Sequence, residues 1–228
     1  MTWYESIADQ FYSCFVMKDR YMMLLRGIGV TVEVSLLAVV IGIIIGFLIA
    51  MCSLSKKKGF RAIGRVYTDV IRGTPSVTQL MIIYFVIFAT VPWPKWVIAA
   101  IAFGINSGAY VSEIIRAGIL SVDKGQTEAG RSLGLSASQT MRKIVLPQAI
   151  KNIFPSLCNE FIVLVKETAI VGYVGLMDIQ KAGDLIKSAT YTAFMPLIGT
   201  AVIYYVMVKI LTLILGRIEN RLRASEVR

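Results

Sequence analysis

Long apolar runs alternate with short polar segments along this chain of 228 residues. Apolar residues make up 56% of it and the mean hydropathy is +0.69, more than a water-soluble core requires. We therefore expect lipid to be its main solvent. A transmembrane helix needs about 20 mainly apolar residues. Five runs reach roughly that length, at residues 27–54, 66–91, 97–115, 152–173 and 194–216.

The first 23 residues follow a different pattern. Trp3, Tyr4, Ile7, Phe11 and Phe15 recur at roughly helical spacing between charged residues. The segment lacks the continuous apolar stretch and the small-residue cleavage site of a signal peptide. Its pattern is typical of an amphipathic helix lying in the membrane interface. The sequence thus predicts an all-α membrane protein, with an amphipathic segment at residues 1–23 and a single transmembrane domain at residues 24–228.

Basic residues indicate the orientation of the chain. They gather between the first and second runs, between the third and fourth, and after the fifth: Lys56, Lys57, Lys58, Arg61, Arg65, Arg116, Lys124, Arg131, Arg142, Lys143, Lys151, Arg217, Arg221, Arg223 and Arg228. Because cytoplasmic loops carry the excess of Lys and Arg, we expect the N-terminus outside and the C-terminus in the cytoplasm. The net charge of +10 is then explained by the basic residues of the cytoplasmic loops. No nucleic acid partner is expected, since no nucleic-acid-binding motif is present.

Several kinds of chemistry are missing from the sequence. Histidine is absent, which removes the commonest general base and the usual nucleophile–histidine pairs. Cys14, Cys52 and Cys158 lie far apart and form no metal-binding or redox motif. No GxxxxGK[ST] phosphate loop occurs, so the chain is not expected to bind ATP in that way. We expect a protein that is not an enzyme and that holds no metal or cofactor of its own.

Gly42 and Gly46 form a GxxxG pattern in the first apolar run. Such a pattern lets two helices approach closely within a membrane. It is also common in apolar runs that make no such contact, so both interpretations stay open.

One polar loop, residues 125–147, is built more elaborately than a plain connection, and we call it the elbow. Glu128 to about Leu133 can form a short helix that Gly134 ends. Ser136 and Gln139 have the spacing of a capping box, which predicts a second short helix. Pro147 would end that helix or bend it into the fourth run. A pair of short helices on a membrane surface is suited to contact a partner.

The elbow resembles a known motif. Its sequence Glu128-Ala129-Gly130, three residues, Gly134, nine residues and Ile144-Val145-Leu146-Pro147 is similar to the EAA loop of bacterial ABC importer permeases. Every spacing is met, and Gly130 replaces the second alanine of that loop. Other segments resemble the permeases for polar amino acids: Arg72-Gly73-Thr74-Pro75 with Gln79-Leu80, Ala109-Tyr110, Glu113, Arg116-Ala117-Gly118-Ile119, Gly125-Gln126 and Lys166-Glu167-Thr168. The likeness runs from about residue 24 to the C-terminus.

The resemblance implies the ABC type I importer permease fold and a place in the bacterial inner membrane. The elbow would be the coupling helix that docks on a cytosolic ATPase, through Glu128, Ala129, Gly130, Gly134, Ile144, Leu146 and Pro147. A dimer of that ATPase would bind ATP and Mg. A second permease subunit, identical or paralogous, would complete the pathway, and an extracellular or periplasmic binding protein would deliver the amino acid. Glu128 would cap the elbow or pair with a basic residue of the ATPase, unless it only favours its own helix N-terminus.

Ionisable residues inside the fourth run need a reason, because each costs about 2.5 to 3.5 kcal/mol to insert. Glu160, Lys166 and Glu167 fall within a sector of roughly 120° on a helix, so they can face one cavity. Acidic and basic groups suit the ammonium and carboxylate of an amino acid. The third run adds polar partners: Asn106, Ser107 and Tyr110. The resemblance implies that these residues bind substrate, and a purely structural ion pair is the alternative.

Pro75 interrupts the second run directly after Arg72, Gly73 and Thr74. Backbone carbonyls freed there can line the transport path, or the proline can supply only a bend for alternating access. We predict a transmembrane subunit of an ATP-driven importer for polar amino acids, with basic ones favoured by the two glutamates of the fourth run. The alternative is an ion-coupled carrier or channel subunit that works without an ATPase, although it would not need the elbow.

Overall fold

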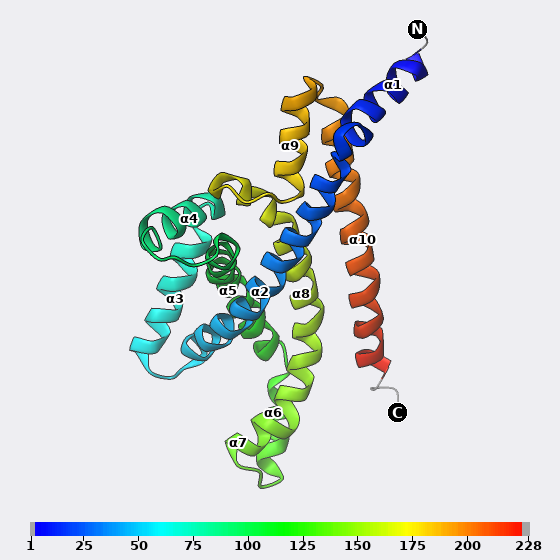
Figure 1. Cartoon of the computed structure of the whole chain (residues 1–228). Helices are drawn as coiled ribbons and strands as arrows, with labels where there is room; N and C mark the ends of the chain where they lie inside the picture. Colours follow the sequence, from blue (N-terminus) through cyan, green and yellow to red (C-terminus); the bar gives the residue numbers. More distant parts are fainter. Residues whose placement is uncertain (1–2, 225–228) are drawn as a thin grey trace. The chain divides into compact units, whose positions relative to one another are not determined.

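The computed structural model describes residues 3–224, and every regular element among them is helical (Figure 1). The α-helices are α1 (Trp3–Phe11), α2 (Tyr21–Leu54), α3 (Lys58–Arg72), α4 (Ser76–Ile82), α5 (Lys95–Leu120), α6 (Lys124–Ser132), α7 (Ala137–Thr140), α8 (Leu146–Glu167), α9 (Ile179–Thr190) and α10 (Phe194–Ala224). Short π- or 3₁₀-helical turns join some of them: η1 (Tyr12–Val16), η2 (Met17–Asp19), η3 (Ile83–Ile87), η4 (Met141–Val145) and η5 (Thr168–Val174).

Within the described residues, α2, α5 and α10 are each long and apolar enough to cross a membrane. The helices from Lys58 to Ile87 meet the same criterion when they are taken together as one broken span. Helix α8 is not among them, because polar and charged residues such as Lys151 and Glu160 interrupt its apolar stretch. A span at residues 152–173, and hence the count of five, stays a prediction.

The helices extend beyond the apolar runs that predicted them. Helix α2 begins at Tyr21 rather than residue 27, α5 continues to Leu120, and α8 begins at Leu146 rather than residue 152. Hydropathy marks only the apolar part of a helix, whereas the backbone hydrogen bonds continue through polar turns at its ends. At the other end of α8, the α-helical pattern stops at Glu167 and tightens into a 3₁₀ helix.

The second predicted span, residues 66–91, is two helices and not one. Helix α3 ends at Arg72 and α4 begins at Ser76, with Gly73, Thr74 and Pro75 between them. The Gly73 amide still donates to the Asp69 carbonyl at 2.9 Å, as the last hydrogen bond of α3. Pro75 has no amide hydrogen to continue the ladder, so the break predicted at this proline is confirmed.

The N-terminal segment, residues 1–23, contains a helix as expected, but the helix covers only part of it. Helix α1 ends at Phe11, and after η1 the backbone turns at Lys18 and Asp19, whose φ angles are 58° and 52°. A positive φ is incompatible with a right-handed helix, so these two residues end the helical path. Helix α2 starts two residues later, at Tyr21. The side chains of Trp3 and Tyr4 lie outside the described part of the chain.

The chain divides into two compact units, which are described separately. The first unit comprises the N-terminal segment up to Ala38, Ser76–Phe103 and Val163–Leu211. The second unit comprises Val39–Pro75, Gly104–Ile162 and the C-terminal segment from Thr212.

The first unit is built around the start of α9. Its buried core contains Cys14, Leu24, Ile179, Ala182 and Ile186. Asp178 caps α9, because its carboxylate accepts hydrogen bonds from the amides of Gln180 (3.1 Å) and Lys181 (3.0 Å). It also accepts one from the Tyr204 hydroxyl of α10 at 3.0 Å. A Cβ added to Gly27 would lie 2.7 Å from the Asp178 backbone, so α2 passes directly against this cap.

The second unit holds α2 against α5. A Cβ added to Gly42 would lie 3.2 Å from the side chain of Ser107, and one added to Gly46 would lie 2.5 Å from Val111 Cγ1. The GxxxG pattern therefore marks a real close contact between these helices. The buried core beneath it contains Ala50, Val111, Ile115, Ala149 and Ile153.

Candidate functional site

The elbow is a compact pair of short helices at the end of α8 (Figure 1). Helix α6 begins at Lys124, earlier than the expected Glu128, because Asp123 caps it by accepting a hydrogen bond from the Gly125 amide at 2.6 Å. It ends where predicted, at Gly134, whose φ of 82° is unfavourable for residues with a side chain. The Leu135 amide donates to the Gly130 carbonyl at 3.1 Å, which completes a Schellman-type C-terminus.

The second helix of the elbow starts with the predicted capping box. The Gln139 amide donates to Ser136 Oγ at 3.2 Å, and the Ser136 amide donates to Gln139 Oε1 at 2.8 Å. Both ends of the turn between α6 and α7 are thus fixed by hydrogen bonds that the sequence itself encodes. Pro147 does not end this helical path. It lies in the first turn of α8, directly after the π-helical turn η4, where a missing amide hydrogen is tolerated.

Gly130 is the one departure from the EAA pattern, and the structure shows what the small residue does. It is buried in the elbow, and a Cβ at this position would lie 2.8 Å from both Ile144 Cδ1 and Thr140 Cγ2. The absence of a side chain lets α6 lie directly on α7 and η4. Ile144 is half-buried and Val145 is buried, whereas Met141 is exposed, so the apolar face of this segment is narrower than its composition indicates.

The outward surface of the elbow is polar and basic. Glu128 is the fifth residue of α6 and is exposed, as are Ala129 and the largely solvent-facing Leu133.

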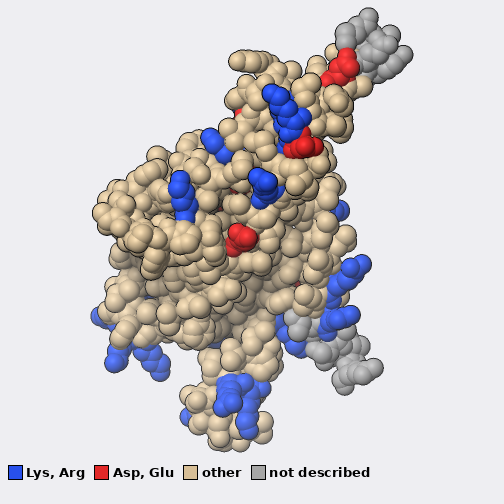
Figure 2. Space-filling view, in the orientation of Figure 1, with Lys and Arg blue, Asp and Glu red and all other residues tan. Residues whose placement is uncertain are grey.

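Asp123 caps the N-terminus of α6, so Glu128 does not have the capping role that was one of its predicted functions. Lys and Arg side chains gather on this end of the second unit (Figure 2). The basic residues of the elbow are Arg131, Arg142 and Lys143.

A second set of polar residues lies between α5 and α8 in the same unit. Ser107 of α5 is buried and donates from its hydroxyl to Glu160 Oε1 of α8 at 2.8 Å. Asn106, the preceding residue, is also buried. Tyr110, one turn further along α5, has the Arg72 guanidinium over its ring, 5.3 Å from the centroid. The structure therefore brings together Ser107 and Glu160, as the sequence predicted, and it places Arg72 against Tyr110.

The other two predicted substrate residues belong to the first unit. Lys166 is exposed and Glu167 is half-buried at the end of α8. Thr168, which follows them, is buried and donates from its hydroxyl to the Val165 carbonyl at 2.7 Å. A joint role for Lys166 and Glu167 with Glu160 stays a prediction from their spacing.

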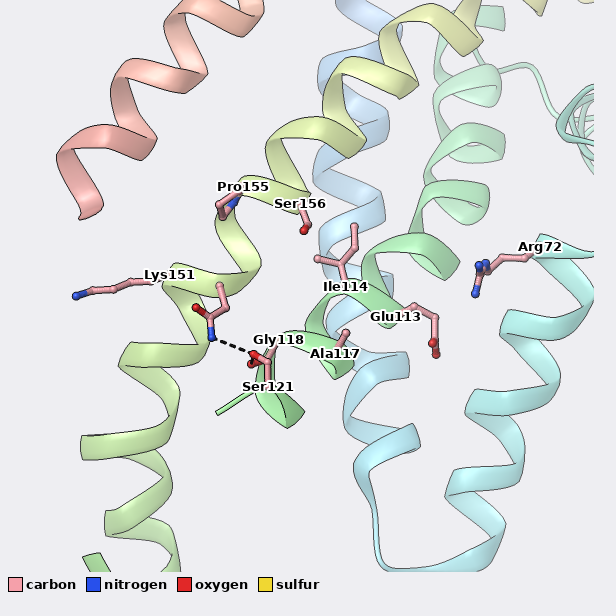
Figure 3. A pocket seen from close by; sticks show the side chains of 10 residues that line it. Arg72, Glu113, Ile114, Ala117, Gly118, Ser121, Lys151, Pro155 and Ser156 are labelled. Carbon is pink, nitrogen blue, oxygen red and sulfur yellow. Dashed lines mark hydrogen bonds between the residues drawn. The ribbon is translucent and has the colours of Figure 1, made fainter. Parts of the chain in front are cut away.

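A cavity of about 780 Å³ opens in the second unit beside α5 and α8 (Figure 3). Its lining residues are Arg72, Glu113, Ile114, Ala117, Gly118, Ser121, Lys151, Asn152, Pro155 and Ser156. Asn152 Nδ2 donates to Ser121 Oγ at 2.9 Å and so ties α8 to α5. Of these residues, only Arg72 was assigned a transport role from the sequence. The available signal was the cluster of polar residues at the end of the third apolar run, which hydropathy treats simply as its boundary.

Comparisons with known proteins agree with this architecture. Residues 39–224 match the model of the family described as "Binding-protein-dependent transport system inner membrane component". An arginine transport system permease protein of Bacillus subtilis is 42% identical over 205 residues, which are 89% of this chain and 94% of that protein. A provisionally named glutamine transport system permease protein of Rickettsia bellii is 43% identical over 208 residues, 90% of this chain and 95% of that protein.

A solved structure supports the fold assignment. The crystal structure of an amino acid ABC transporter with histidines superposes with a TM-score of 0.83 at 43% identity, covering 90% of this chain and 97% of that chain. The fold and the elbow therefore define an ABC importer permease of type I. The chain belongs to the family of binding-protein-dependent transport system inner membrane components.

Family membership decides several of the predictions. The chain is a multi-pass inner-membrane transport subunit and not an enzyme, and it works with an ATPase and a binding protein. The relatives are permease subunits of ABC systems, which supports this function over an ion-coupled carrier or channel. We propose below how the termini are oriented, which subunits form the assembly and what individual residues do.

Proposed function

We propose that this chain is a transmembrane subunit of an ATP-driven importer for polar amino acids, with basic amino acids as its leading substrates. The observation that carries the proposal is the Glu160 carboxylate, held by the buried Ser107 hydroxyl at 2.8 Å within a chain of this family. A carboxylate fixed between two helices offers a charged acceptor to an ammonium or guanidinium group. The relatives named for arginine and glutamine transport support polar amino acids as the substrate class.

The substrate site that we propose lies on the facing sides of α5 and α8. Glu160 accepts the cationic group of the amino acid, and Ser107 keeps the carboxylate in position. Asn106 and Tyr110 provide neighbouring polar groups on α5. The assignment of Lys166 and Glu167 to the substrate carboxylate and to the same acidic lining rests on their spacing along the sequence.

We further propose that the elbow is the coupling helix. Its outward surface, which includes Glu128 and Ala129, docks on an ATPase subunit, and Glu128 pairs there with a basic residue. The tight packing at Gly130 and the fixed turn at Gly134 support a rigid-body role, because a rigid short helix can transmit displacement from one subunit to another. Ile144 lies in η4, and Leu146 and Pro147 begin α8, so these three residues carry the chain from the elbow into α8.

The assembly follows from these roles. Two permease subunits, identical or paralogous, enclose the pathway and open to opposite sides as a dimer of ATPases binds and hydrolyses ATP with Mg. An extracellular or periplasmic binding protein delivers the amino acid. The excess of Lys and Arg supports an N-terminus outside the cell, with the elbow and the C-terminus in the cytoplasm of a bacterium. The break at Arg72, Gly73, Thr74 and Pro75 provides a hinge beside the pathway.

The substrate class can be tested by ATPase stimulation. The chain is purified with its co-expressed ATPase and binding protein in lipid nanodiscs, and the rate of ATP hydrolysis is measured with each candidate amino acid. We expect arginine and lysine to stimulate hydrolysis most, because Glu160 provides a negative charge for their side chains or ammonium groups. Stimulation by glutamate or aspartate without any response to basic amino acids would contradict the proposed specificity.

A further inference from the structure

A second cavity of about 420 Å³ lies in the same unit, among the end of α2, α3 and α5. It shares Arg72 and Glu113 with the larger cavity, but its lining is different in kind. Its lining residues are Ser53, Arg61, Arg65, Thr68, Asp69, Arg72, Glu113 and Arg116. The cavity thus gathers four guanidinium groups from two helices.

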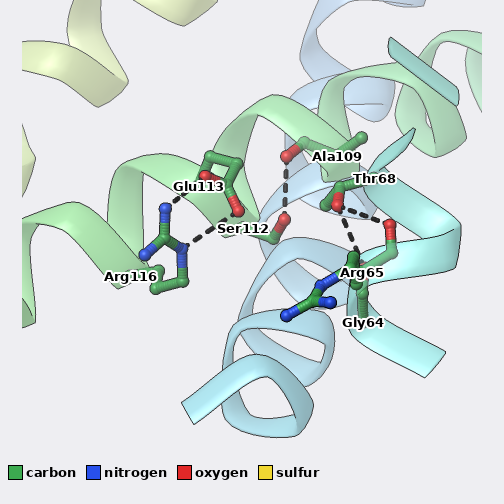
Figure 4. Close-up of polar contacts among 7 residues, drawn as sticks. All are labelled: Gly64, Arg65, Thr68, Ala109, Ser112, Glu113 and Arg116. Atoms are coloured by element: carbon green, nitrogen blue, oxygen red, sulfur yellow. Dashed lines mark hydrogen bonds and ion pairs between the residues drawn. The ribbon is translucent and has the colours of Figure 1, made fainter. Parts of the chain in front are cut away.

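The charges of this lining are not balanced. Glu113 is occupied by Arg116, whose Nη2 and Nε lie 2.7 Å and 3.1 Å from its two carboxylate oxygens (Figure 4). Asp69 is the other carboxylate of the lining. Four arginines against two acidic residues leave an excess of two positive charges around the cavity. An anion entering this space would relieve the repulsion between them.

The arginines occupy one face of α3, and the opposite face is apolar. Positions 61, 65, 69 and 72 of the helix fall within about 80° of one another. The other face exposes apolar side chains to the surroundings: Phe60, Ile63, Val66 and Val70. A helix with one basic and one apolar face is typical of the boundary between lipid and water.

Topology alone does not account for these arginines. The loop before α3 already carries Lys56 and Lys57, and Lys58 begins the helix, which supplies the positive charge that orients a membrane segment. Arg61 and Arg65 lie further along, four residues apart, where like charges destabilise a helix. Arginine, with its planar fork of donors, is also the side chain best matched to an oxyanion with several acceptor oxygens.

We propose that the cavity lined by Arg61, Arg65, Arg72 and Arg116 binds a phosphate-class anion. Basic pockets between transmembrane helices are known to receive the head groups of anionic lipids, so a phosphodiester lipid head group is one source of this anion. A soluble phosphate is the other source, and it presents the same oxygens to the same guanidinium groups. Either ligand would brace α3 against α5 next to Arg72 and the break at Pro75.

The test compares two variants of the same net charge, Arg65→Gln in the cavity and Lys58→Gln outside it. Each is purified with its ATPase subunit in neutral detergent, and native mass spectrometry measures retained phosphatidylglycerol against phosphatidylcholine. A parallel thermal-unfolding series uses inorganic phosphate, with chloride at equal ionic strength as the control. Both variants are first required to match the wild type in unfolding temperature without added ligand. If Arg65→Gln fails that requirement, Arg65→Lys, which keeps the charge but loses the planar fork, replaces it.

If the anion is a lipid head group, the wild type should retain phosphatidylglycerol in preference to phosphatidylcholine. Arg65→Gln should reduce this retention about fivefold, because one basic residue near the membrane surface contributes about 1 kcal/mol. Lys58→Gln should leave it unchanged. A soluble source predicts stabilisation by phosphate but not chloride, lost in Arg65→Gln alone. The proposal is overturned if the wild type shows neither preferential retention of phosphatidylglycerol nor stabilisation by phosphate. It is also overturned if Arg65→Gln reduces these effects no more than Lys58→Gln does. These outcomes do not depend on transport, so they stand apart from the proposed amino acid specificity.

Discussion

Glu160 is the residue on which the proposed substrate site depends most. Replacing it by glutamine keeps the shape and the contact with Ser107 but removes the charge. A charge-assisted hydrogen bond contributes about 1.5 to 3 kcal/mol, so we expect Glu160→Gln to weaken amino acid binding and stimulation of ATP hydrolysis roughly tenfold or more. Glu33→Gln is the matched control, because Glu33 is an exposed glutamate of α2. The measurement is the rate of ATP hydrolysis as a function of arginine concentration. If the two variants give the same curve, Glu160 is not part of the substrate site.

Asp178 gives a prediction about pH. Burial raises the pKa of its carboxyl above the ordinary 3.8, and the hydrogen bonds from Lys181, Gln180 and Tyr204 offset this only in part. The folded protein therefore holds this proton to higher pH than the unfolded chain does. The resulting stabilisation is complete below about pH 4 and is lost as the pH rises through the folded pKa.

The variant Asp178→Asn keeps a capping oxygen and has no proton to lose in this range. We expect the unfolding temperature of the variant, relative to that of the wild type, to increase as the pH is raised from about 4 to 8. The measurement is thermal unfolding of both proteins in the same detergent across that range. A difference that stays constant or decreases with pH would show that Asp178 does not titrate as its burial indicates.

Sequence reasoning at the scale of residues succeeded where a local rule applies. The Ser136–Gln139 capping box and the end of the first short helix at Gly134 follow from neighbouring residues alone. The function of Gly130 could not be foreseen, because its partners Thr140 and Ile144 approach it only after the elbow has folded. The cap at Asp123 lies five residues before Glu128, so the spacing of the motif that begins at Glu128 does not include it.

At the scale of elements, the contact between α2 and α5 depends on the absence of a side chain at Gly46. An added Cβ would lie 2.5 Å and 2.6 Å from two atoms of Val111, a β-branched residue with little freedom to move. We expect Gly46→Ala to destabilise the protein by about 1 to 3 kcal/mol, the usual cost of overpacking.

Gly29→Ala is the control for this effect on the same helix, since nothing lies within 4 Å of its added Cβ. Both variants gain the helix propensity of alanine, so the difference between them isolates the contact. Thermal unfolding in detergent measures it. An unfolding temperature for Gly46→Ala equal to that of Gly29→Ala would mean that the two helices are not held this closely.

The elbow makes an independent prediction about coupling. Gly134 has a φ of 82° with nothing within 4 Å of an added Cβ, so its substitution acts through backbone strain alone. Valine should cost about 1 to 2 kcal/mol there, whereas asparagine tolerates this conformation. We expect Gly134→Val to weaken co-purification of the ATPase subunit by a factor of about 5 to 30, and Gly134→Asn to have little effect. If both variants retain the ATPase fully, the turn is not part of the docking surface.

Element types were predicted better than element boundaries. Hydropathy found the apolar parts of α2, α5 and α10 but not their polar ends, because hydrogen bonding continues where lipid contact stops. Pro75 correctly indicated a break, since proline cannot donate to the helix ladder. The turn at Lys18 and Asp19 gave no sign in the sequence, because lysine rarely adopts a positive φ and a single aspartate is too common to mark such a turn.

At the scale of the whole molecule, motif spacing was enough to indicate the family, and the comparisons confirm it. The two arginine-bearing cavities were not predicted. Their lining residues come from α2, α3, α5 and α8, and no periodicity within one segment shows which positions of separate helices will converge. Sequence patterns therefore identified the elements and the elbow, while the cavities needed the folded structure.

The central claim is that ATP hydrolysis by a separate subunit drives amino acid uptake through this chain. The direct measurement is uptake of radiolabelled arginine into proteoliposomes that contain the chain, its ATPase subunit and a binding protein on the outside, with ATP and Mg enclosed. We predict accumulation that requires enclosed ATP and the binding protein and persists when ion gradients are collapsed. Uptake that continues without the ATPase subunit, or that follows an imposed ion gradient without ATP, would contradict the account.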